Sequence, residues 1–166
     1  MLWNDNIQAG IILHTRDDAS NVFKDKLKFA FDNLDPRIRA LFDITSDSSS
    51  ELSFSHGSTI RVGTSLRSST LQYLHISEFG KICCKYPEKA QEVITGALNT
   101  VHAGQSIIIE STAEGKEGYY HDMWEIAWAN KKAKKPLSTL EFSASFFPWH
   151  REISYSLGKE MGNLLK

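Results

Sequence analysis

The sequence predicts an α/β domain of three layers, in which helices cover a mostly parallel β-sheet. Short apolar runs alternate along the chain with segments whose apolar residues recur every three or four positions, the pattern of strands followed by amphipathic helices. The composition, with 41% hydrophobic and 23% charged residues in a chain of 166, is that of an ordinary globular domain. We therefore expect residues 1–166 to form a single domain.

The first strand and helix are expected close to the N-terminus. The apolar run AGIILHT predicts a buried strand over residues 9–15. The following segment, RDDASNVFKDKLKFAFDNL, carries apolar residues at helical spacing from Ala19 to Leu34. Asp17 or Asp18 is expected to cap this helix, because a short carboxylate accepts hydrogen bonds from the free N–H groups of the first turn.

A loop and a β-hairpin are expected next. The segment DITSDSSSELSF is polar and rich in serine, which indicates a loop. In ELSFSHGSTIRVGTS, apolar and polar residues alternate on both sides of His56-Gly57. This pattern is typical of two antiparallel strands joined by a tight turn.

The middle of the chain predicts a strand, a helix and a second strand. YLHISEFGK begins with an apolar run, residues 73–76, that indicates a short buried strand. Pro87 suits the first turn of a helix whose apolar residues continue at intervals of three and four, and Gly104 is expected to end it. QSIIIEST predicts the second buried strand. Two strands joined in this way should be parallel, with a right-handed connection.

The C-terminal part predicts one more helix and one more strand. GYYHDMWEIAWANKKAKK has Tyr120, Trp124 and Trp128 four residues apart, which places them on one face of a helix. An aromatic stripe of this kind usually belongs to a core, and a base-stacking platform is the alternative. LEFSASFF alternates as a strand would, FPWH ends it, and the tail from about residue 152 has a weakly helical pattern.

Polar residues end the two strands of the middle segment. Ser77-Glu78 follow the first strand, and Glu110-Ser111-Thr112 follow the second. Both groups are expected at one edge of the sheet, because ligands of parallel sheets bind at the carboxyl ends of the strands. In nucleotide hydrolases a carboxylate at this edge orients the attacking water, and a neighbouring hydroxyl senses the γ-phosphate. The alternative is that both groups are ordinary polar strand ends.

The sequence contains no phosphate-binding loop of the pattern G-x-x-x-x-G-K-[ST]. The three Gly-Lys pairs end at Lys81, Lys116 and Lys159, and none is followed by Ser or Thr. None has a glycine five positions before its own glycine either. A complete nucleotide cradle is therefore not predicted within these residues.

Several segments closely resemble the ATPase domain of the large terminase subunit of tailed bacteriophages and prophages. They are GTSLRSSTLQYLHISEFGKI, TGALNTV, IIIESTAEGKEGYYHDM and FFPWH, and the resemblance spans nearly the whole chain. It implies a P-loop NTPase sheet of the additional-strand, catalytic-glutamate type, without the strand that carries the phosphate loop. It also implies a motor that hydrolyses ATP to package viral DNA into procapsids.

The resemblance implies a role for each residue of the expected site. Glu78 corresponds to the catalytic glutamate, and Ser111 and Thr112 correspond to the coupling motif. Arg67 corresponds to an arginine of the nucleotide site. Ser77 stands where the family has the aspartate that holds magnesium, so Mg²⁺ would be held through a hydroxyl or a water. The implied cofactors of the full-length protein are ATP and Mg²⁺.

The resemblance also implies partners and a place in the cell. The partners are double-stranded viral DNA, the portal and the small terminase subunit, in the cytoplasm of a bacterial host. The phosphate-loop segment of the family should precede AGIILHT, and its nuclease domain should follow FFPWH. We therefore expect an internal piece of the motor that binds ATP weakly and is inactive alone. The alternative is a non-catalytic prophage remnant or assembly module that keeps the same sheet.

An unfilled position is expected beside the second buried strand. In this family the strand of the phosphate loop lies next to the coupling strand, so one edge of QSIIIEST should lack its neighbour. Unpaired backbone groups on a strand edge favour pairing with another strand. We expect LEFSASFF to fill the position, or two copies of the chain to form a homodimer through this edge.

The net charge gives no indication of a nucleic-acid partner. Nineteen Lys and Arg against 20 Asp and Glu give a net charge of -1, so the chain has no overall positive field.

The cysteines, two histidines and one basic run are given structural interpretations. The adjacent Cys83 and Cys84 are expected to be reduced thiols. His14 and His75 are expected to be packing residues, with metal ligation as the alternative. The basic run KKAKK is expected to be solvated at a helix end, with phosphate binding as the alternative.

The sequence contains no transmembrane or secretory signal. No apolar stretch approaches the roughly 18 residues that a membrane span requires. The N-terminal segment MLWNDNIQAG lacks the features of a signal peptide. We therefore expect a soluble protein of the cytoplasm.

Overall fold

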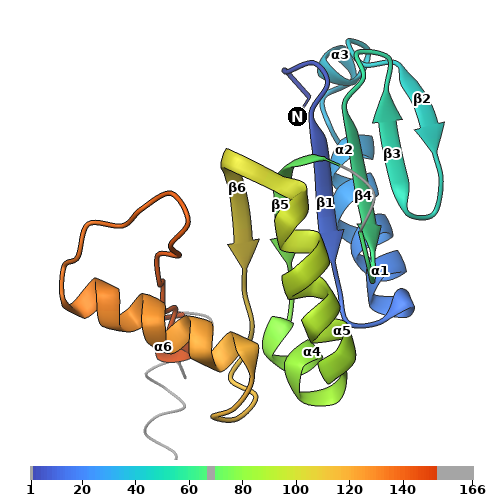
Figure 1. The fold of residues 1–166 in the computed structure, drawn as a ribbon. Coiled ribbons are helices and arrows are strands. Elements are labelled where there is room, and N and C mark those ends of the chain that lie inside the picture. The colour runs from blue at the N-terminus through green and yellow to red at the C-terminus, as the bar shows by residue number, and fades with distance from the viewer. Residues whose placement is uncertain (1, 67–69, 153–166) are drawn as a thin grey trace, which may run out of the picture. The chain divides into compact units, whose positions relative to one another are not determined.

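The structure is a computed structural model that describes residues 2–66 and 70–152. It divides into two compact units, one that ends at Glu125 and one that begins at Ile126. The first unit holds a six-stranded sheet in the order β2-β3-β4-β1-β5-β6 (Figure 1). The strands are β1 (Gln8–Ile12), β2 (Ile44–Asp47), β3 (Glu51–Phe54), β4 (Thr59–Gly63), β5 (Leu71–Ile76) and β6 (Val101–Ile109).

The sheet is mostly parallel, as the sequence predicts. Strand β1 pairs in parallel with β4 and β5, and β5 pairs in parallel with β6. Only β3 runs against its neighbours, β2 and β4. The expected α/β class is therefore confirmed.

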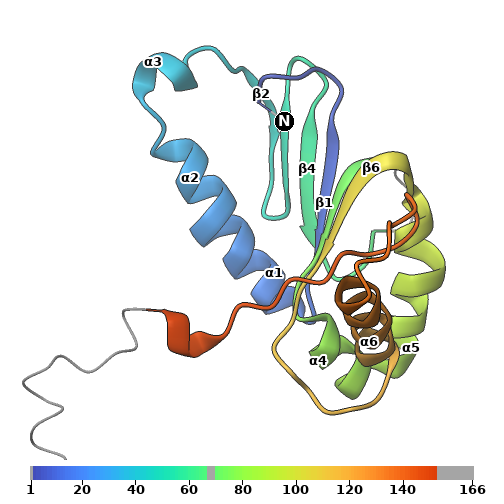
Figure 2. The same cartoon turned by 90° about the vertical axis from the view of Figure 1, so that its left-hand side faces the viewer.

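Helices cover both faces of this sheet (Figure 2). One face carries a continuous helical segment made of α1 (Arg16–Val22), the π-helix η1 (Phe23–Lys28) and α2 (Phe29–Asp32). The other face carries α4 (Phe79–Lys85), α5 (Pro87–Glu92), the π-helix η2 (Val93–Ala97) and the 3₁₀ turn η3 (Leu98–Thr100). The short helix α3 (Pro36–Arg39) leads into β2.

A separate apolar core lies on each face of the sheet. On the α1 side, Phe23 and Phe31 pack with Leu52, Phe54 and Val62 of β3 and β4. On the α4 side, side chains of β1 and β5 meet those of α4, α5 and η2. The members of this second core, each at most 3% exposed, are Ile12, Leu71, Leu74, Ile76, Phe79, Ile82, Ala90, Val93 and Ala97. In β5, Leu71, Leu74 and Ile76 belong to this second core, whereas Gln72 and His75 are partly buried and Tyr73 is 49% exposed.

The first helix has a different N-cap from the one expected. Thr15 is the cap, in an extended conformation, and its hydroxyl oxygen accepts a hydrogen bond from Asp18 N at 3.1 Å. The Thr15 hydroxyl in turn donates to the Asp18 carboxylate. The prediction of Asp17 or Asp18 was wrong, because β1 ends at Ile12 and the helix starts already at Arg16. Both aspartates lie in the first turn, where their negative charge interacts favourably with the positive end of the helix dipole.

The serine-rich segment predicted as a loop is mostly a hairpin. Strands β2 and β3 pair antiparallel, and the turn between them is closed by Ser48 N donating to Glu51 O at 2.9 Å. The Ser48 hydroxyl also accepts from Glu51 N at 3.0 Å. Serine hydroxyls stabilise such a turn, so a polar composition did not exclude strands. The hairpin predicted at His56-Gly57 is confirmed, with Gly57 at φ +80° between β3 and β4.

The predicted strand, helix and strand of the middle segment are confirmed, with one boundary corrected. The expected burial of the second strand was wrong, because the described side chains of β6 are partly buried or exposed, with Ile108 at 61%. The helix starts at Pro87 as expected, but its last turn ends at Thr100 and β6 begins at Val101. Gly104 therefore does not end the helix. It lies inside β6 at φ +87°, where the β5–β6 register shifts, and such a backbone conformation favours glycine.

The strand predicted for LEFSASFF is absent, so this segment does not fill the position beside β6. Helix α6 (Tyr119–Lys132) is confirmed, but residues 142–148 have no regular structure. Lys131 Nζ donates to Ala144 O at 2.7 Å, and Lys135 Nζ donates to Glu141 Oε1 at 2.6 Å. The first of these contacts occupies a backbone oxygen that a strand ladder could use, and the second joins two side chains. A 3₁₀ turn, η4 (Trp149–Arg151), follows, and the tail predicted as weakly helical lies almost entirely outside the described residues.

Within the described part of the chain, no helix combines the length and the apolar composition that crossing a membrane requires.

Candidate functional site

The carboxyl ends of β5 and β6 are held together by backbone hydrogen bonds that continue beyond the strands. Glu110 N donates to Ile76 O at 3.0 Å, and Phe79 N donates to Glu110 O at 3.1 Å. On the other side of β5, Ser77 N donates to Ile12 O at 2.9 Å. The residues that follow the two strands are therefore fixed at one edge of the sheet.

Glu78 has an unusual backbone conformation at this edge. Its φ of 54° and ψ of 43° are left-handed, a region that residues other than glycine rarely adopt. It occupies the N-cap position of α4, yet its side chain makes no capping hydrogen bond. The left-handed turn lets the chain pass at once from β5 into α4, where Phe79 is fully buried. Positive φ at a non-glycine residue is often found at functional sites.

Two hydroxyls from the end of β6 approach the Glu78 carboxylate. Thr112 Oγ1 donates to Glu78 Oε2 at 3.2 Å, and Ser111 Oγ lies 3.5 Å from the same oxygen. Glu78 and Ser111 are partly buried and Thr112 is exposed, so water has access to the carboxylate. The group is thus a half-exposed carboxylate with hydroxyl donors on one of its oxygens.

Ser111 also satisfies the N-terminus of α4. Gly80 N donates to Ser111 Oγ at 3.1 Å, which supplies a partner for one of the N–H groups that have none within the helix. The capping group thus comes from the segment after β6, 31 positions away in the chain. This capping bond explains the presence of a serine at position 111 without any ligand.

Tyr120, in the first turn of α6, lies beside Phe79 and Gly80 at the start of α4. Its ring meets that of Phe79 edge-on, with the centroids 6.3 Å apart. Burial, followed by the nearby carboxylates of Glu110 and Glu78, raises the pKa of the Tyr120 phenol above its usual range. The phenol therefore stays neutral at physiological pH and is available as a hydrogen-bond donor.

The structure brings together three of the residues that the sequence singled out, Glu78, Ser111 and Thr112, and Ser77 is adjacent to them in the chain. Arg67 lies outside the described residues. Gly80 was not singled out, although a glycine inside a helix costs stability and for that reason indicates a packing or functional requirement. Cys83 and Cys84 are free thiols, as expected.

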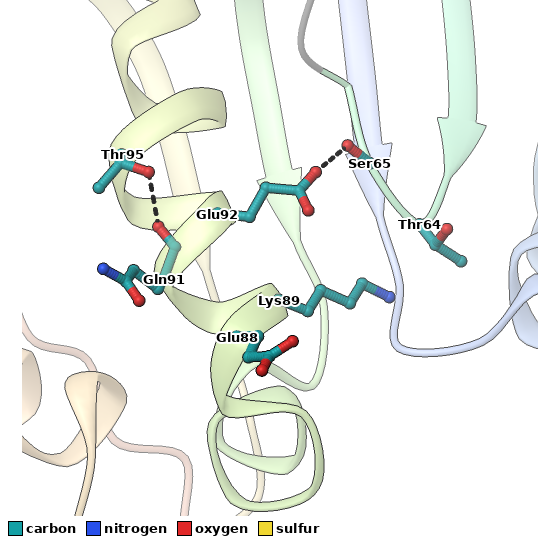
Figure 3. Close-up of a pocket in the computed structure, with 7 residues that line it drawn as sticks. All are labelled: Thr64, Ser65, Glu88, Lys89, Gln91, Glu92 and Thr95. Carbon is teal, nitrogen blue, oxygen red and sulfur yellow. Dashed lines mark hydrogen bonds between the residues drawn. The ribbon is translucent and has the colours of Figure 1, made fainter.

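A second polar group lies farther along the same edge, where β4 ends beside α5 (Figure 3). Lys89 Nζ reaches across to the backbone oxygens of Leu13 and His14, at 3.0 and 2.9 Å, and burial lowers the pKa of this ammonium group. Nearby, Ser65 Oγ donates to Glu92 Oε1 at 2.5 Å. The pocket of about 550 Å³ is lined by Thr64, Ser65, Glu88, Lys89, Gln91, Glu92 and Thr95. No local signal in the sequence predicted it, because its walls come from segments about 25 residues apart.

His14 and His75, the two histidines considered as metal ligands, each lie beside one carboxylate. His14 Nε2 lies 3.0 Å from Asp18 Oδ2, while its buried Nδ1 has no partner within the described part of the chain. His75 Nε2 lies 3.4 Å from Glu110 Oε1, without the geometry of a hydrogen bond. Residues 2–66 and 70–152 contain no group of three or more His, Cys, Asp or Glu side chains that could hold a metal.

The aromatic residues of α6 have different surroundings at the two ends of the stripe, and the last of them contacts the basic run. Tyr120 packs against the core on the α4 side, as a core stripe would. Trp128 instead has Lys131 Nζ and Lys132 Nζ at 5.4 and 5.7 Å from its ring centroid, the geometry of cation–π contacts. The lysines of KKAKK are exposed, as expected, but Lys131 and Lys135 are also bound to Ala144 and Glu141.

Comparison with models of protein families and with curated proteins finds no match to this chain.

Proposed function

We propose that the chain is part of the ATP-hydrolysing motor of a terminase large subunit, which packages viral DNA into procapsids. Glu78 orients the water that attacks the γ-phosphate, and Ser111 and Thr112 respond to the presence of that phosphate. The observation that carries this proposal is the contact of one carboxylate with two hydroxyls at the carboxyl ends of adjacent parallel strands. This edge is where parallel sheets bind ligands.

The geometry suits a carboxylate that changes partners. Both hydroxyl contacts use Oε2 of Glu78, so Oε1 can accept a hydrogen bond from a water molecule. The contact distances, 3.2 and 3.5 Å, are long for bonds to a carboxylate, so little energy is needed to turn the side chain toward a substrate. Ser111 and Thr112 would then exchange Glu78 for a phosphate oxygen, which is how they would report hydrolysis.

Within the part of the chain that the structure describes, no cluster of His, Cys, Asp and Glu side chains forms a magnesium site by itself. Mg²⁺ in phosphoryl-transfer enzymes is held by one or two carboxylates together with substrate phosphates. The edge of the sheet offers Glu78, the adjacent Ser77 and the two hydroxyls, and the described residues contain no group of His, Cys, Asp and Glu that could hold a metal alone. We therefore assign no step to a metal, and ATP with its ion would require the phosphate loop of the parent motor.

The free edge of β6 supports the P-loop NTPase type of sheet. Strand β6 is the last strand of the sheet in the described part of the chain, and it is the strand that leads to Ser111 and Thr112. In the family that the sequence resembles, the strand of the phosphate loop occupies the position beside this one. We propose that the free edge accepts that strand in the parent motor, which also binds viral DNA, the portal and the small terminase subunit.

A second copy of the chain is the occupant we propose when the phosphate-loop strand is absent. Ile108 of β6 is 61% exposed, and an unpaired edge strand with apolar side chains favours pairing. Sedimentation of the chain at rising concentration should therefore show dimers, and Ile108→Lys should weaken them. Leu140→Lys, at a site 83% exposed outside the sheet, is the matched control. A monomer at every concentration would contradict the homodimer.

The function is tested by titrating ATP into this chain and into a version extended upstream with the phosphate-loop segment of a terminase. We expect weak binding and no turnover for the first, and binding with hydrolysis for the second. Glu78→Gln should abolish hydrolysis in the extended version while leaving nucleotide binding in place. Glu110→Gln, which removes the neighbouring carboxylate at the same edge, should leave hydrolysis nearly unchanged. Turnover that survives Glu78→Gln would contradict the assignment.

The second candidate is a non-catalytic assembly module with the same sheet. It is favoured by the capping bond from Gly80 N to Ser111 Oγ, which explains this serine without a nucleotide, and by Ser77 in place of an acidic ligand. An extended version that binds no ATP would establish this second function over the first.

A further inference from the structure

Gly80 is enclosed on three sides at the point where α4 meets the end of β6. A Cβ atom built on this glycine would lie 2.9 Å from Ser111 Oγ, 3.3 Å from Thr112 O and 3.3 Å from Tyr120 Cδ1. Cβ atoms essentially never approach another atom this closely in real structures, so a side chain at this position requires another group to move. The group that can move most easily is the Ser111 hydroxyl, because a rotation about one bond displaces it.

The hydrogen bond from Gly80 also determines where the Ser111 proton points. A serine hydroxyl has a single proton, and its oxygen here accepts from Gly80 N at 3.1 Å. The O–H group is then free to donate toward Glu78 Oε2, 3.5 Å away. Gly80 thus orients the hydroxyl as a donor toward the carboxylate.

We propose that Gly80 is a positioning residue for Glu78, acting through the Ser111 hydroxyl. Its N–H holds the serine oxygen, and its missing side chain leaves the space that this oxygen occupies. A substitution that fills this space would break the link between Glu78 and the end of β6 while leaving both residues in the chain. The proposal rests on the proposed function only in that Glu78 is the residue worth positioning.

The first test is an NMR measurement on the isotope-labelled chain without nucleotide. The readouts are the side-chain carboxyl ¹³C shift of Glu78 and the Hα–Hβ couplings of Ser111, which report its rotamer. We expect Gly80→Ala to change the Ser111 rotamer and to shift the Glu78 carboxyl signal in the same direction as Ser111→Ala. Gly63→Ala is the control, since its Cβ would meet only Ser65 O and Ser65 N, at 3.6 and 4.0 Å. A Glu78 signal unchanged by Gly80→Ala would overturn the proposal.

The second test is a rescue. If the added methyl group collides with Ser111 Oγ, removing that oxygen should relieve the collision. We expect Gly80→Ala with Ser111→Ala to unfold at the midpoint of Ser111→Ala alone or above it, so that the two losses are not additive. Additive losses would overturn the proposal.

A conservative pair keeps the proposal testable if Gly80→Ala fails to fold. Ser111→Thr retains the hydroxyl and should retain the Glu78 carboxyl signal, whereas Ser111→Ala should shift it. Equal signals in the two variants would overturn the proposal. Because none of these measurements uses a nucleotide, failure of the link and failure of the ATPase function are separate results.

Discussion

Ser111 follows Glu78 by 33 positions in the chain, yet its hydroxyl oxygen lies 3.5 Å from Glu78 Oε2 and accepts a hydrogen bond from Gly80 N at 3.1 Å. One side chain therefore serves both the start of α4 and the carboxylate in front of it. The arrangement depends on the left-handed backbone of Glu78, which turns the chain sharply from β5 into α4.

The left-handed conformation of Glu78 should cost stability. A residue with a Cβ atom is less stable in this region than glycine by roughly 1–2 kcal/mol, and glycine loses part of that gain through its larger entropy in the unfolded chain. We expect Glu78→Gly to raise the free energy of unfolding by up to about 1 kcal/mol relative to Glu78→Ala, which keeps the Cβ and loses the same carboxylate. Urea denaturation of both variants measures the difference. Equal stabilities would show that the turn stores no strain.

Phe79 should be the main anchor of the site on the sheet. Its side chain is fully buried in the core on the α4 side, next to Tyr120. Phe79→Ala should lower the free energy of unfolding by about 3–5 kcal/mol, because it removes apolar contacts and leaves a cavity. Phe29→Ala, at a helical position 62% exposed, should change it by no more than about 0.5 kcal/mol. Similar losses in the two variants would contradict the core described above.

Thr15 should contribute more to the first helix than either aspartate that follows it. Its hydroxyl caps a helical segment that continues from Arg16 to Asp32, so Thr15→Ala should cost about 1 kcal/mol. Ser20→Ala, in the exposed interior of the same helix, should be neutral or slightly stabilising because alanine has the higher helix propensity. Chemical denaturation distinguishes the two. A larger loss of unfolding free energy for Asp17→Ala than for Thr15→Ala would contradict Thr15 as the cap.

The pKa of Glu141 should lie well below that of an ordinary glutamate. The Lys135 ammonium group, followed by the backbone and hydroxyl of Ser138, lowers the pKa of Glu141 from 4.5 to about 2. The unfolded chain therefore takes up this proton at a higher pH than the folded chain does. The contact stabilises the fold above pH 4.5, and this contribution is lost as the pH falls toward about 2.

The midpoint of Glu141 is measured by a ¹³C titration of its side-chain carboxyl group. Lys135→Gln should move the midpoint up toward 4.5, since it removes the first cause of the shift. Lys134→Gln changes a neighbouring exposed lysine and should leave the midpoint in place. A wild-type midpoint near 4.5 would show that Lys135 and Glu141 are not paired in solution.

The sequence alone predicted most of the elements that the structure contains. Apolar residues of β1 and β5 are buried by helices and the described ones of β6 are partly buried or exposed, yet the apolar runs were sufficient to identify all three strands. The spacing in α1, α5 and α6 likewise identified helices, and Pro87 marked a helix start. The polar ends of β5 and β6 were expected at one edge, because parallel strands end on the same side of a sheet.

The misassigned segments were those in which side-chain contacts decided the local structure. The serine-rich segment forms β2 and β3 because Ser48 closes the turn between them. LEFSASFF forms no strand, and the backbone oxygen of Ala144 is bound instead by Lys131 of α6. Neither outcome follows from alternation of apolar and polar residues.

By itself, the sequence determined the class of fold and the two strand ends at which polar residues gather, because burial and strand direction follow from local patterns. Only the tertiary structure decided that Ser111 caps α4, that Glu78 is left-handed and that Gly80 has no room for a side chain. These properties depend on where segments 31 to 34 residues apart come into contact. A distance of a few tenths of an ångström between such segments is set by packing, which no local pattern encodes.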